Sequence, residues 1–212
     1  MGARFCNSLL KAVFFLALSL LGLASTASAK NPTYVEFDYP NANSTNVTAI
    51  NSGGTVTGMY CDVLGCHGFL RTLAGKLTSF DYPGASETQP LAIDALGRVV
   101  GIYSFFPDYL DRTFLRTPDG KFHDIDPPDA MWSITTNISP TGVVTGYYGD
   151  ALYPITGERH GFEYTPGGNW TILDVPGAVS SQLQARNLPG FIVGVYDDAS
   201  FASHGFLRTP GG

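Results

Sequence analysis

The sequence predicts an all-β domain, which we expect to be a β-propeller of four blades with four antiparallel strands each. One unit of 43 to 48 residues repeats four times, and the units are rich in Val, Ile, Thr, Tyr and Phe, which strands favour. No window after residue 29 shows the 3.6-residue period of a helix. Four short strands in a unit of this length are typical of one propeller blade.

Each unit carries three landmarks. An aspartate in an Asp-x-Pro turn comes first, and a glycine always follows it 20 residues later. A histidine, or an arginine in the second unit, comes 9 to 14 residues after that glycine, and the next aspartate always comes 14 residues later. All length variation is therefore confined to one loop per unit. The landmarks are Asp38, Gly58 and His67; Asp81, Gly101 and Arg112; Asp126, Gly146 and His160; and Asp174, Gly194 and His204.

The residue types between the landmarks predict strands separated by turns. The Asp-x-Pro sequence favours a turn because aspartate accepts backbone hydrogen bonds and proline fixes φ. A glycine turn separates the first two strands, the variable loop the second and third, and a short hairpin the last two. The strands are expected at 48–51, 55–60, 68–71 and 77–80; at 91–94, 99–103, 113–116 and 122–125; at 136–139, 143–148, 161–164 and 170–173; and at 184–187, 192–196 and 205–208.

The segment 33–40 has the pattern of a further fourth strand. Its sequence Thr-Tyr-Val-Glu-Phe-Asp-Tyr-Pro parallels Lys-Leu-Thr-Ser-Phe-Asp-Tyr-Pro at 76–83. We therefore predict that this strand completes the last unit, closes the ring and removes an exposed edge. The alternatives are a fragment of a longer array and a solenoid without its terminal strand. The predicted domain spans 30–212, with repeats at about 38–80, 81–125, 126–173 and 174–212, the last completed by 33–40.

Residues 1–29 have the features of a signal peptide. Arg4 and Lys11 form a basic start, residues 12–24 are apolar, and an Ala-Ser-Ala triplet ending at Ala29 matches the small-residue cleavage pattern. The apolar run is too short to span a bilayer. We expect cleavage after Ala29 and a mature chain that is secreted, periplasmic or at the cell surface, without membrane insertion. The alternative is an uncleaved anchor.

The charge balance argues against two classes of partner. The whole sequence has a formal net charge of −6. The predicted signal removes two of the 12 basic residues and none of the 18 acidic ones, so the mature chain has a net charge of −8. Nucleic acids and anionic membranes select clustered Lys and Arg, so neither is expected as a partner. We expect no cofactor, with calcium held by turn carboxylates as the alternative.

Cys61 and Cys66 are the two cysteines of the predicted mature chain, because Cys6 lies in the signal. Four residues separate them inside the variable loop of the first unit. An even pair this close, in an oxidising compartment, predicts a disulfide. The alternative is a metal site that adds Asp62 and His67, although this spacing matches no standard zinc framework.

The recurring histidine is predicted to be structural, because a catalytic group is needed once and this position recurs in nearly every unit. We expect it to bond an aspartate of the adjoining loop. The recurring aspartates are expected to form turns, with a calcium shell as the alternative. The expected pairs are His67 with Asp62, His160 with Asp150, His204 with Asp197 or Asp198, and Arg112 with Asp108 or Asp111.

The four variable loops form the predicted recognition surface. In an antiparallel meander they share one face with the Asp-x-Pro turns, and we call this the variable-loop face. Aromatic side chains there could stack on sugars or anchor a protein, and carboxylates could bind hydroxyls or calcium. The alternative is that the aromatics fold down onto the core. The candidate residues are Phe105, Phe106, Asp108, Tyr109, Asp111, Asp150, Tyr153, Asp197, Asp198 and Phe201.

Arg186 stands where the first strands of the other units carry Ile50, Ile93 and Ile138. The first strand lines the central channel of a propeller, so Arg186 is a candidate for binding an anion there. The alternatives are an ion pair with a neighbouring carboxylate and a local shift of strand register.

One short motif recurs at the start of the third strands. It is His67-Gly68-Phe69, His160-Gly161-Phe162 and His204-Gly205-Phe206, with Ile50-Asn51, Gly54 and Gly58 upstream in the first unit. Arg112-Thr113-Phe114 replaces it in the second unit. These residues resemble the extracellular HAF repeats of bacteria, named after a His-Ala-Phe triplet, with Gly in place of Ala. The resemblance covers about residues 34–212. It implies an exported, propeller-like repeat protein and carries no established activity or catalytic residue.

We predict an exported, non-catalytic binding module that recognises an extracellular glycan or a protein on its variable-loop face. The sequence has no G-x-S-x-G, no H-E-x-x-H, no P-loop and no dinucleotide fingerprint. One alternative is a propeller enzyme that acts on extracellular polysaccharide with carboxylates from the same face. The other is a structural surface protein that associates with itself.

Overall fold

The structure is a computed structural model that describes residues 33–152 and 156–211. The predicted signal peptide lies outside these residues, and so does Tyr153. Residues from Phe37 onward belong to one compact unit. Within the described ranges, no helix has the length and apolar character needed to cross a membrane.

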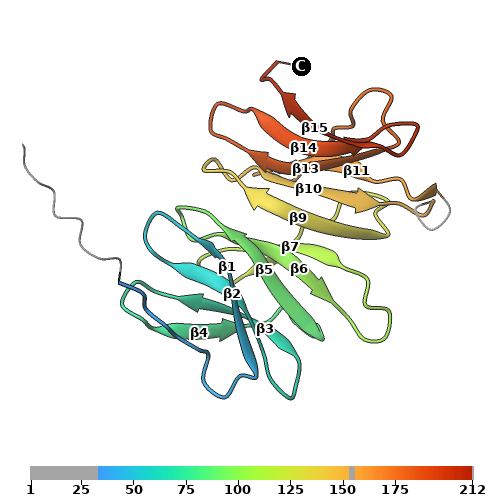
Figure 1. Ribbon diagram of the computed structural model, residues 1–212. Coiled ribbons are helices and arrows are strands. Elements are labelled where there is room, and N and C mark those ends of the chain that lie inside the picture. Colours follow the sequence, from blue (N-terminus) through green and yellow to red (C-terminus); the bar gives the residue numbers. More distant parts are fainter. Residues whose placement is uncertain (1–32, 153–155, 212) are drawn as a thin grey trace, which may run out of the picture. The chain divides into compact units, whose positions relative to one another are not determined.

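The described residues form 15 strands, arranged as four antiparallel meanders, one for each sequence unit (Figure 1). These meanders confirm the predicted all-β fold class. The strands are β1 (Ser44–Ile50), β2 (Val56–Cys61), β3 (Cys66–Arg71) and β4 (Leu77–Phe80); β5 (Glu87–Ile93), β6 (Val99–Ser104), β7 (Arg112–Arg116) and β8 (Phe122–Asp124); β9 (Trp132–Ile138), β10 (Val144–Gly149), β11 (His160–Thr165) and β12 (Asn169–Ile172); and β13 (Ser180–Arg186), β14 (Ile192–Asp197) and β15 (Ser203–Arg208).

The meanders pack on one another in chain order, the first on the second, the second on the third and the third on the fourth. The first two form one sheet of eight strands, because β3 and β5 make a short parallel contact. The third is a four-stranded sheet, and the fourth has three strands in the order β13-β14-β15. Side chains cross all three junctions. Thr48 Oγ1 donates to Pro90 O at 2.9 Å, Thr136 Oγ1 donates to Leu183 O at 2.8 Å, and Trp170 Nε1 donates to Ile125 O at 3.3 Å.

A bulge in each first strand explains the recurring glycine. The register between the first and second strands shifts at the same place in all four meanders. The bulge brings a carbonyl of the first strand over the glycine of the second. A Cβ on Gly58 would lie 2.0 Å from Asn46 O, and one on Gly101 would lie 2.2 Å from Gln89 O. Any residue other than glycine would push the two strands apart.

The residue directly after each first strand caps the following turn. Asn51 Oδ1 accepts from the Gly53 and Thr55 amides, at 3.0 and 2.9 Å. Asp94 and Asn187 bond the equivalent turns through Oδ1, and Ser139 does so through Oγ. The side chain thus closes the turn locally, which helps to set where the second strand begins.

The core is centred on one phenylalanine from the third strand of each of the first three meanders. Phe69, Phe114 and Phe162 are completely buried. Phe114 packs in a cluster with Phe80 from β4, so this cluster joins the first meander to the second. The core therefore lies between the meanders, and no meander has a complete core of its own.

The closure predicted for residues 33–40 is not formed in the structure. Residues 33–39 contain no strand, and the described residues provide no fourth strand for β15. Phe37 instead packs on the first meander, with its ring 6.1 Å from that of Phe69 and the Arg71 guanidinium 4.6 Å above it. Since the fourth meander packs on the third, it lies at the other end of the array from these contacts.

The bulge makes a specific prediction for the glycine of the second unit. Gly101→Ala should destabilise the fold by about 1–3 kcal/mol, because the added Cβ meets a backbone carbonyl that cannot turn away. A thermal melt should show a loss of roughly 2–4 °C per kcal/mol. Gly53→Ala is the control, since its Cβ would meet only the Asn51 side chain, at 3.3 Å. Equal melting temperatures for Gly101→Ala and wild type would contradict this explanation.

Candidate functional site

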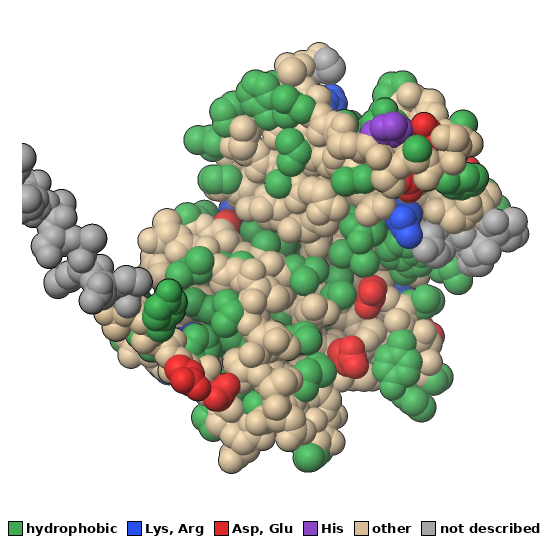
Figure 2. Space-filling view, in the orientation of Figure 1, with side chains coloured by type: hydrophobic (Ala, Val, Ile, Leu, Met, Phe, Trp, Pro, Cys, Tyr) green, Lys and Arg blue, Asp and Glu red, His purple; other side chains and the backbone are tan. Residues whose placement is uncertain are grey.

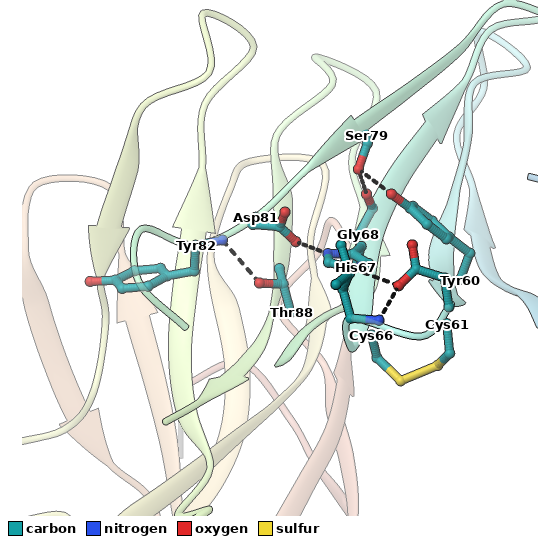
Figure 3. Close-up of polar contacts among 11 residues, drawn as sticks. Tyr60, Cys61, Cys66, His67, Gly68, Ser79, Asp81, Tyr82 and Thr88 are labelled. Atoms are coloured by element: carbon teal, nitrogen blue, oxygen red, sulfur yellow. Dashed lines mark hydrogen bonds and ion pairs between the residues drawn. A yellow bond between two sulfur atoms is a disulfide. The ribbon is translucent and has the colours of Figure 1, made fainter. Parts of the chain in front are cut away.

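The constant interval of 14 residues corresponds to a hydrogen bond between histidine and aspartate. The Nδ1–H of His67 donates to Asp81 Oδ1 at 2.9 Å (Figure 3). The Nδ1–H of His160 donates to Asp174 Oδ2 at 2.8 Å. The histidine begins the third strand and the aspartate follows the fourth, so antiparallel pairing brings them together. Asp174 Oδ1 also accepts from the Gly161 amide at 3.1 Å.

These contacts revise the predicted pairs. His67 does approach Asp62, with 3.5 Å between Nε2 and Oδ1, and His204 Nε2 lies 3.1 Å from Asp198 Oδ2. His160 bonds Asp174 and not the predicted Asp150, because the end of the fourth strand lies nearer to the start of the third than the loop carboxylate does.

The second unit replaces this link with hydroxyl groups. Asp126 accepts from the amide and the hydroxyl of Thr113, at 2.8 and 2.9 Å, and also from the Ser133 hydroxyl. Arg112 lies 3.9 Å from Asp108, one of its predicted partners. Three of the recurring aspartates, Asp81, Asp126 and Asp174, therefore tie the fourth strand to the third, a role that goes beyond the predicted turn.

Every variable loop contains an aspartate that shapes its backbone. Asp62, Asp108, Asp150 and Asp198 each accept through Oδ1 from the amide two residues later, at 2.7, 3.4, 2.8 and 2.8 Å. The signal was visible in the sequence as Asp-x-Leu in three of the four loops. Three candidate carboxylates of the variable-loop face, those of Asp108, Asp150 and Asp198, are thus already engaged within their own loops.

The surrounding donors favour the ionised form of two of these carboxylates. The Leu64 amide, with a smaller effect from His67, lowers the pKa of Asp62. The Ser200 hydroxyl and then His204 lower the pKa of Asp198. Ser200 Oγ donates to Asp198 Oδ1 at 2.6 Å, and the Ala202 amide donates to the same oxygen at 3.0 Å.

The predicted disulfide between Cys61 and Cys66 is present and joins the ends of β2 and β3. The two sulfurs are therefore bonded to each other and cannot bind a metal as thiolates. In the described part of the chain, no group of three or more His, Cys, Asp or Glu residues is arranged to hold a metal ion.

The candidate aromatic residues divide into buried and exposed groups. Phe105 is half-buried and packs edge-on against Tyr82 and Tyr103, so it seals the core, as the alternative interpretation had it. Phe106 and Phe201 are 73% and 75% exposed. Phe106 and Tyr109 form an edge-to-face pair with ring centroids 5.8 Å apart.

All four variable loops present at least one exposed apolar side chain. The prediction from sequence included only aromatic residues and missed the aliphatic ones. Val63 and Leu64, on the loop closed by the disulfide, are 90% and 83% exposed, and Leu152 is also exposed. Their place in the same Asp-x-Leu turns was the signal that could have found them. The exposed anchors are Val63, Leu64, Phe106, Tyr109, Leu152 and Phe201.

Asp111 is a candidate carboxylate that lies beside a small cavity. Burial, with a smaller effect from the nearby Glu87 carboxylate, raises the pKa of Asp111. The adjoining cavity, lined in part by Tyr103 and Ser104, has a volume of about 10 Å³. That is room for roughly one water molecule. Asp197, another candidate, accepts a hydrogen bond from the Ser203 hydroxyl.

Arg186 pairs with Glu163, with 2.6 Å between the guanidinium Nη1 and the carboxylate Oε1. Glu163 is almost fully buried. An ion pair with a neighbouring carboxylate was the predicted alternative to an anion site at Arg186. The Glu163 carboxylate balances the charge of the guanidinium.

Comparison with known proteins finds similarity in structure only. No protein-family model matches the sequence, and no curated protein matches it. Selenomethionine-substituted virginiamycin B lyase from Staphylococcus aureus has a TM-score of 0.47 at 14% identity, over 80% of this chain and 57% of that one. The catalytically inactive variant of the same enzyme with quinupristin has a TM-score of 0.50 at 15% identity, over 84% and 60%. A streptogramin B lyase structure has 0.44 at 14%, over 80% and 56%.

The likeness concerns the fold. Virginiamycin B lyase is a β-propeller, so this chain has a β-propeller-like all-β fold. The chain spans less than two thirds of the length of these lyases. At 15% identity the comparison carries no function across.

The link at the third unit is expected to stabilise the fold. Asp174→Ala removes the acceptor of the His160 and Gly161 hydrogen bonds and should cost about 1–2 kcal/mol. The thermal midpoint should fall by several degrees, whereas Asp119→Ala, in an exposed hairpin turn, should change it far less. Equal effects of the two variants would show that the 14-residue link has no special role.

The loop of the fourth unit should show a pH dependence. The pKa of Asp198 is lower in the folded state, so its stabilising contribution is complete above the unfolded value of about 3.9 and is lost as pH falls through the folded value. The difference in melting temperature between wild type and Asp198→Asn should shrink below about pH 4. A difference that grows on acidification would contradict this assignment.

Proposed function

We propose that this chain is a non-catalytic binding module that docks a protein partner on its variable-loop face. The observation that carries the proposal is the set of exposed anchors, at least one on each variable loop. Large exposed apolar side chains cost solubility, so their presence on all four loops of one face favours an interaction surface. Interfaces concentrate their energy in a few aromatic and apolar anchors of this kind.

The anchors stand in loops whose described turns are held by hydrogen bonds. Each loop has its aspartate-capped turn, and the first is also closed by the Cys61–Cys66 disulfide. Phe201 is held at a φ of 61° by a turn in which its amide bonds the Asp198 carbonyl at 2.8 Å. Ordering such loops before binding lowers the entropic cost of association.

A protein partner fits the anchors better than a glycan does. Val63, Leu64 and Leu152 are aliphatic, and they offer no flat ring on which a sugar could stack. The pair of Phe106 and Tyr109 is the one feature that favours a glycan. A glycan ligand is therefore the second candidate, restricted to the loop of the second unit.

An enzymatic role is less well supported. The neighbours in structure are lyases, but fold and function separate readily at this level of identity. The carboxyl pair of Asp111 and Glu87 opens onto a cavity of about 10 Å³, which is too small for a sugar ring. The carboxylates of Asp108, Asp150 and Asp198 serve their own loops.

Further parts of the proposal rest on the sequence. Each meander is taken as one propeller blade, so the chain contributes four blades. We assign the chain to the bacterial HAF repeats on the basis of its His-Gly-Phe motifs. We expect the predicted signal peptide to direct export of the chain to the periplasm, the cell surface or the medium. In those compartments the partner would be an extracellular protein or glycan.

Binding can be tested by replacing the anchors on one face only. A variant with Leu64→Ser, Phe106→Ser, Leu152→Ser and Phe201→Ser should lose capture of envelope and secreted proteins of the source organism. The control carries Leu73→Ser, Leu96→Ser and Leu188→Ser in exposed turns of the opposite face, and it should retain capture. Captured proteins are identified by mass spectrometry and confirmed with the purified partner.

Three outcomes separate the candidates. Loss of binding by the control as well would overturn the assignment to the variable-loop face. Saturable binding of a polysaccharide that Phe106→Ala and Tyr109→Ala abolish would replace the protein partner by a glycan. Release of reducing ends from polysaccharide by wild type, abolished in Asp111→Asn, would make the chain an enzyme.

A further inference from the structure

Charged residues are divided unequally between the two faces that carry the connections. Among the 15 strands of the described residues, seven connections lie on the variable-loop face and seven on the opposite face. The connections of the variable-loop face contain ten acidic residues and one basic residue, whereas those of the opposite face contain two acidic and three basic residues. The variable-loop face is therefore the acidic side of the molecule.

The opposite face balances its own acidic residues. Arg98 pairs with Asp94, with 2.6 Å between guanidinium and carboxylate, and Lys121 lies 2.9 Å from Asp119. On the variable-loop face the aspartates that shape the loops accept from backbone amides, and Arg112 comes no nearer to Asp108 than 3.9 Å. An amide stabilises a carboxylate without cancelling its charge. The variable-loop face therefore keeps its negative charge in the folded chain.

Two carboxylates of this face lie close enough to repel each other. Asp111 follows the variable loop of the second unit, and Glu87 begins β5, and both line the same small cavity. Burial, and then the negative charge of Glu87, raise the pKa of Asp111. A cationic group placed beside the two carboxylates would relieve this repulsion.

The carboxylates stand beside the exposed anchors. Every variable loop has an aspartate within three positions of an anchor along the chain. Figure 2 shows the same mixture on the surface, with carboxylates among hydrophobic side chains and little of Lys or Arg. A complementary surface must offer apolar groups and positive charge together. The neighbours are Asp62 with Leu64, Asp108 with Phe106 and Tyr109, Asp150 with Leu152, and Asp198 with Phe201.

We infer that the partner docked on the variable-loop face is a cationic protein surface, on which Lys and Arg side chains surround apolar ones. The inference rests on the proposed function and adds the chemistry of the partner. Apolar side chains of the partner bury the anchors, and its ammonium and guanidinium groups meet the loop carboxylates at the rim of the contact. The segregated charge also steers such a partner to this face and away from the opposite one.

Three labelled peptides of equal length test the chemistry with the full chain. The first alternates Leu with Lys, the second alternates Leu with Gln, and the third alternates Ser with Lys. Fluorescence anisotropy should show saturable binding of the Leu–Lys peptide and much weaker binding of the other two. Raising the ionic strength to about 0.3 M should weaken binding of the Leu–Lys peptide, because salt screens exposed charges.

A neutralised variant tests which face is responsible. Glu87→Gln, Asp129→Asn and Glu158→Gln remove three charges near the variable loops and spare the aspartates that hold turns and junctions. This variant should melt as wild type does and bind the Leu–Lys peptide about tenfold more weakly, the effect of three exposed ion pairs. The control removes three charges from turns of the opposite face and should bind as wild type does. It carries Lys76→Gln, Asp119→Asn and Lys121→Gln.

The anchor variant of the proposed function separates the possible failures. Equal binding of the Leu–Lys and Leu–Gln peptides, lost in the anchor variant, would keep the protein-binding face and overturn the cationic partner. Equal binding of the Leu–Lys and Ser–Lys peptides, unchanged in the anchor variant, would overturn both proposals. Wild-type affinity in the neutralised variant, or no saturable binding of the Leu–Lys peptide by wild type, would overturn the inference alone.

Discussion

The structure depends on one junction, where the aspartate after a fourth strand meets the residue that opens the third. His67 with Asp81 and His160 with Asp174 make this contact through the imidazole, and Asp126 makes it through hydroxyl groups and an amide. Because the junction joins both ends of one hairpin, the chain between them cannot change in length. The interval stays at 14 residues, and insertions are accepted only in the loop before the histidine. The same junction thus fixes the length of the hairpin between the third and fourth strands and confines length variation to the variable loops.

The loops of the variable-loop face are ordered by the strands on either side of them. Each loop leaves a second strand whose register is set by the glycine and the bulge, and it returns to a third strand held by the junction. The loop aspartates then close the remaining turn, which fixes the direction of residues such as Leu64 and Leu152. Exposed apolar side chains on an ordered backbone suit protein recognition, because little entropy is lost when they are buried.

The sequence predicted the fold class, the disulfide and the positions of the second, third and fourth strands, because these follow from spacing and turn chemistry. Each first strand begins four residues earlier than predicted, since the bulge lets it continue past the point where the sequence pattern indicates a strand. It did not predict the acceptor of His160, since that depends on which carboxylate the strand register brings nearest. The exposed aliphatic residues were not predicted, because from the sequence alone an aliphatic residue is expected to lie in the core. They are Val63, Leu64 and Leu152. The predicted closure is not formed: residues 33–39 contain no strand in the structure, although 33–40 resembles 76–83 in sequence.

The account claims above all that a third strand is complete only when a fourth strand and its aspartate cover it. Amide hydrogen exchange tests this claim most directly. Asp174→Ala should speed the exchange of the β11 amides, because it removes the acceptor of the His160 and Gly161 hydrogen bonds, and should leave β3 unchanged. Unchanged exchange in β11, or an equal increase in β3, would contradict the account.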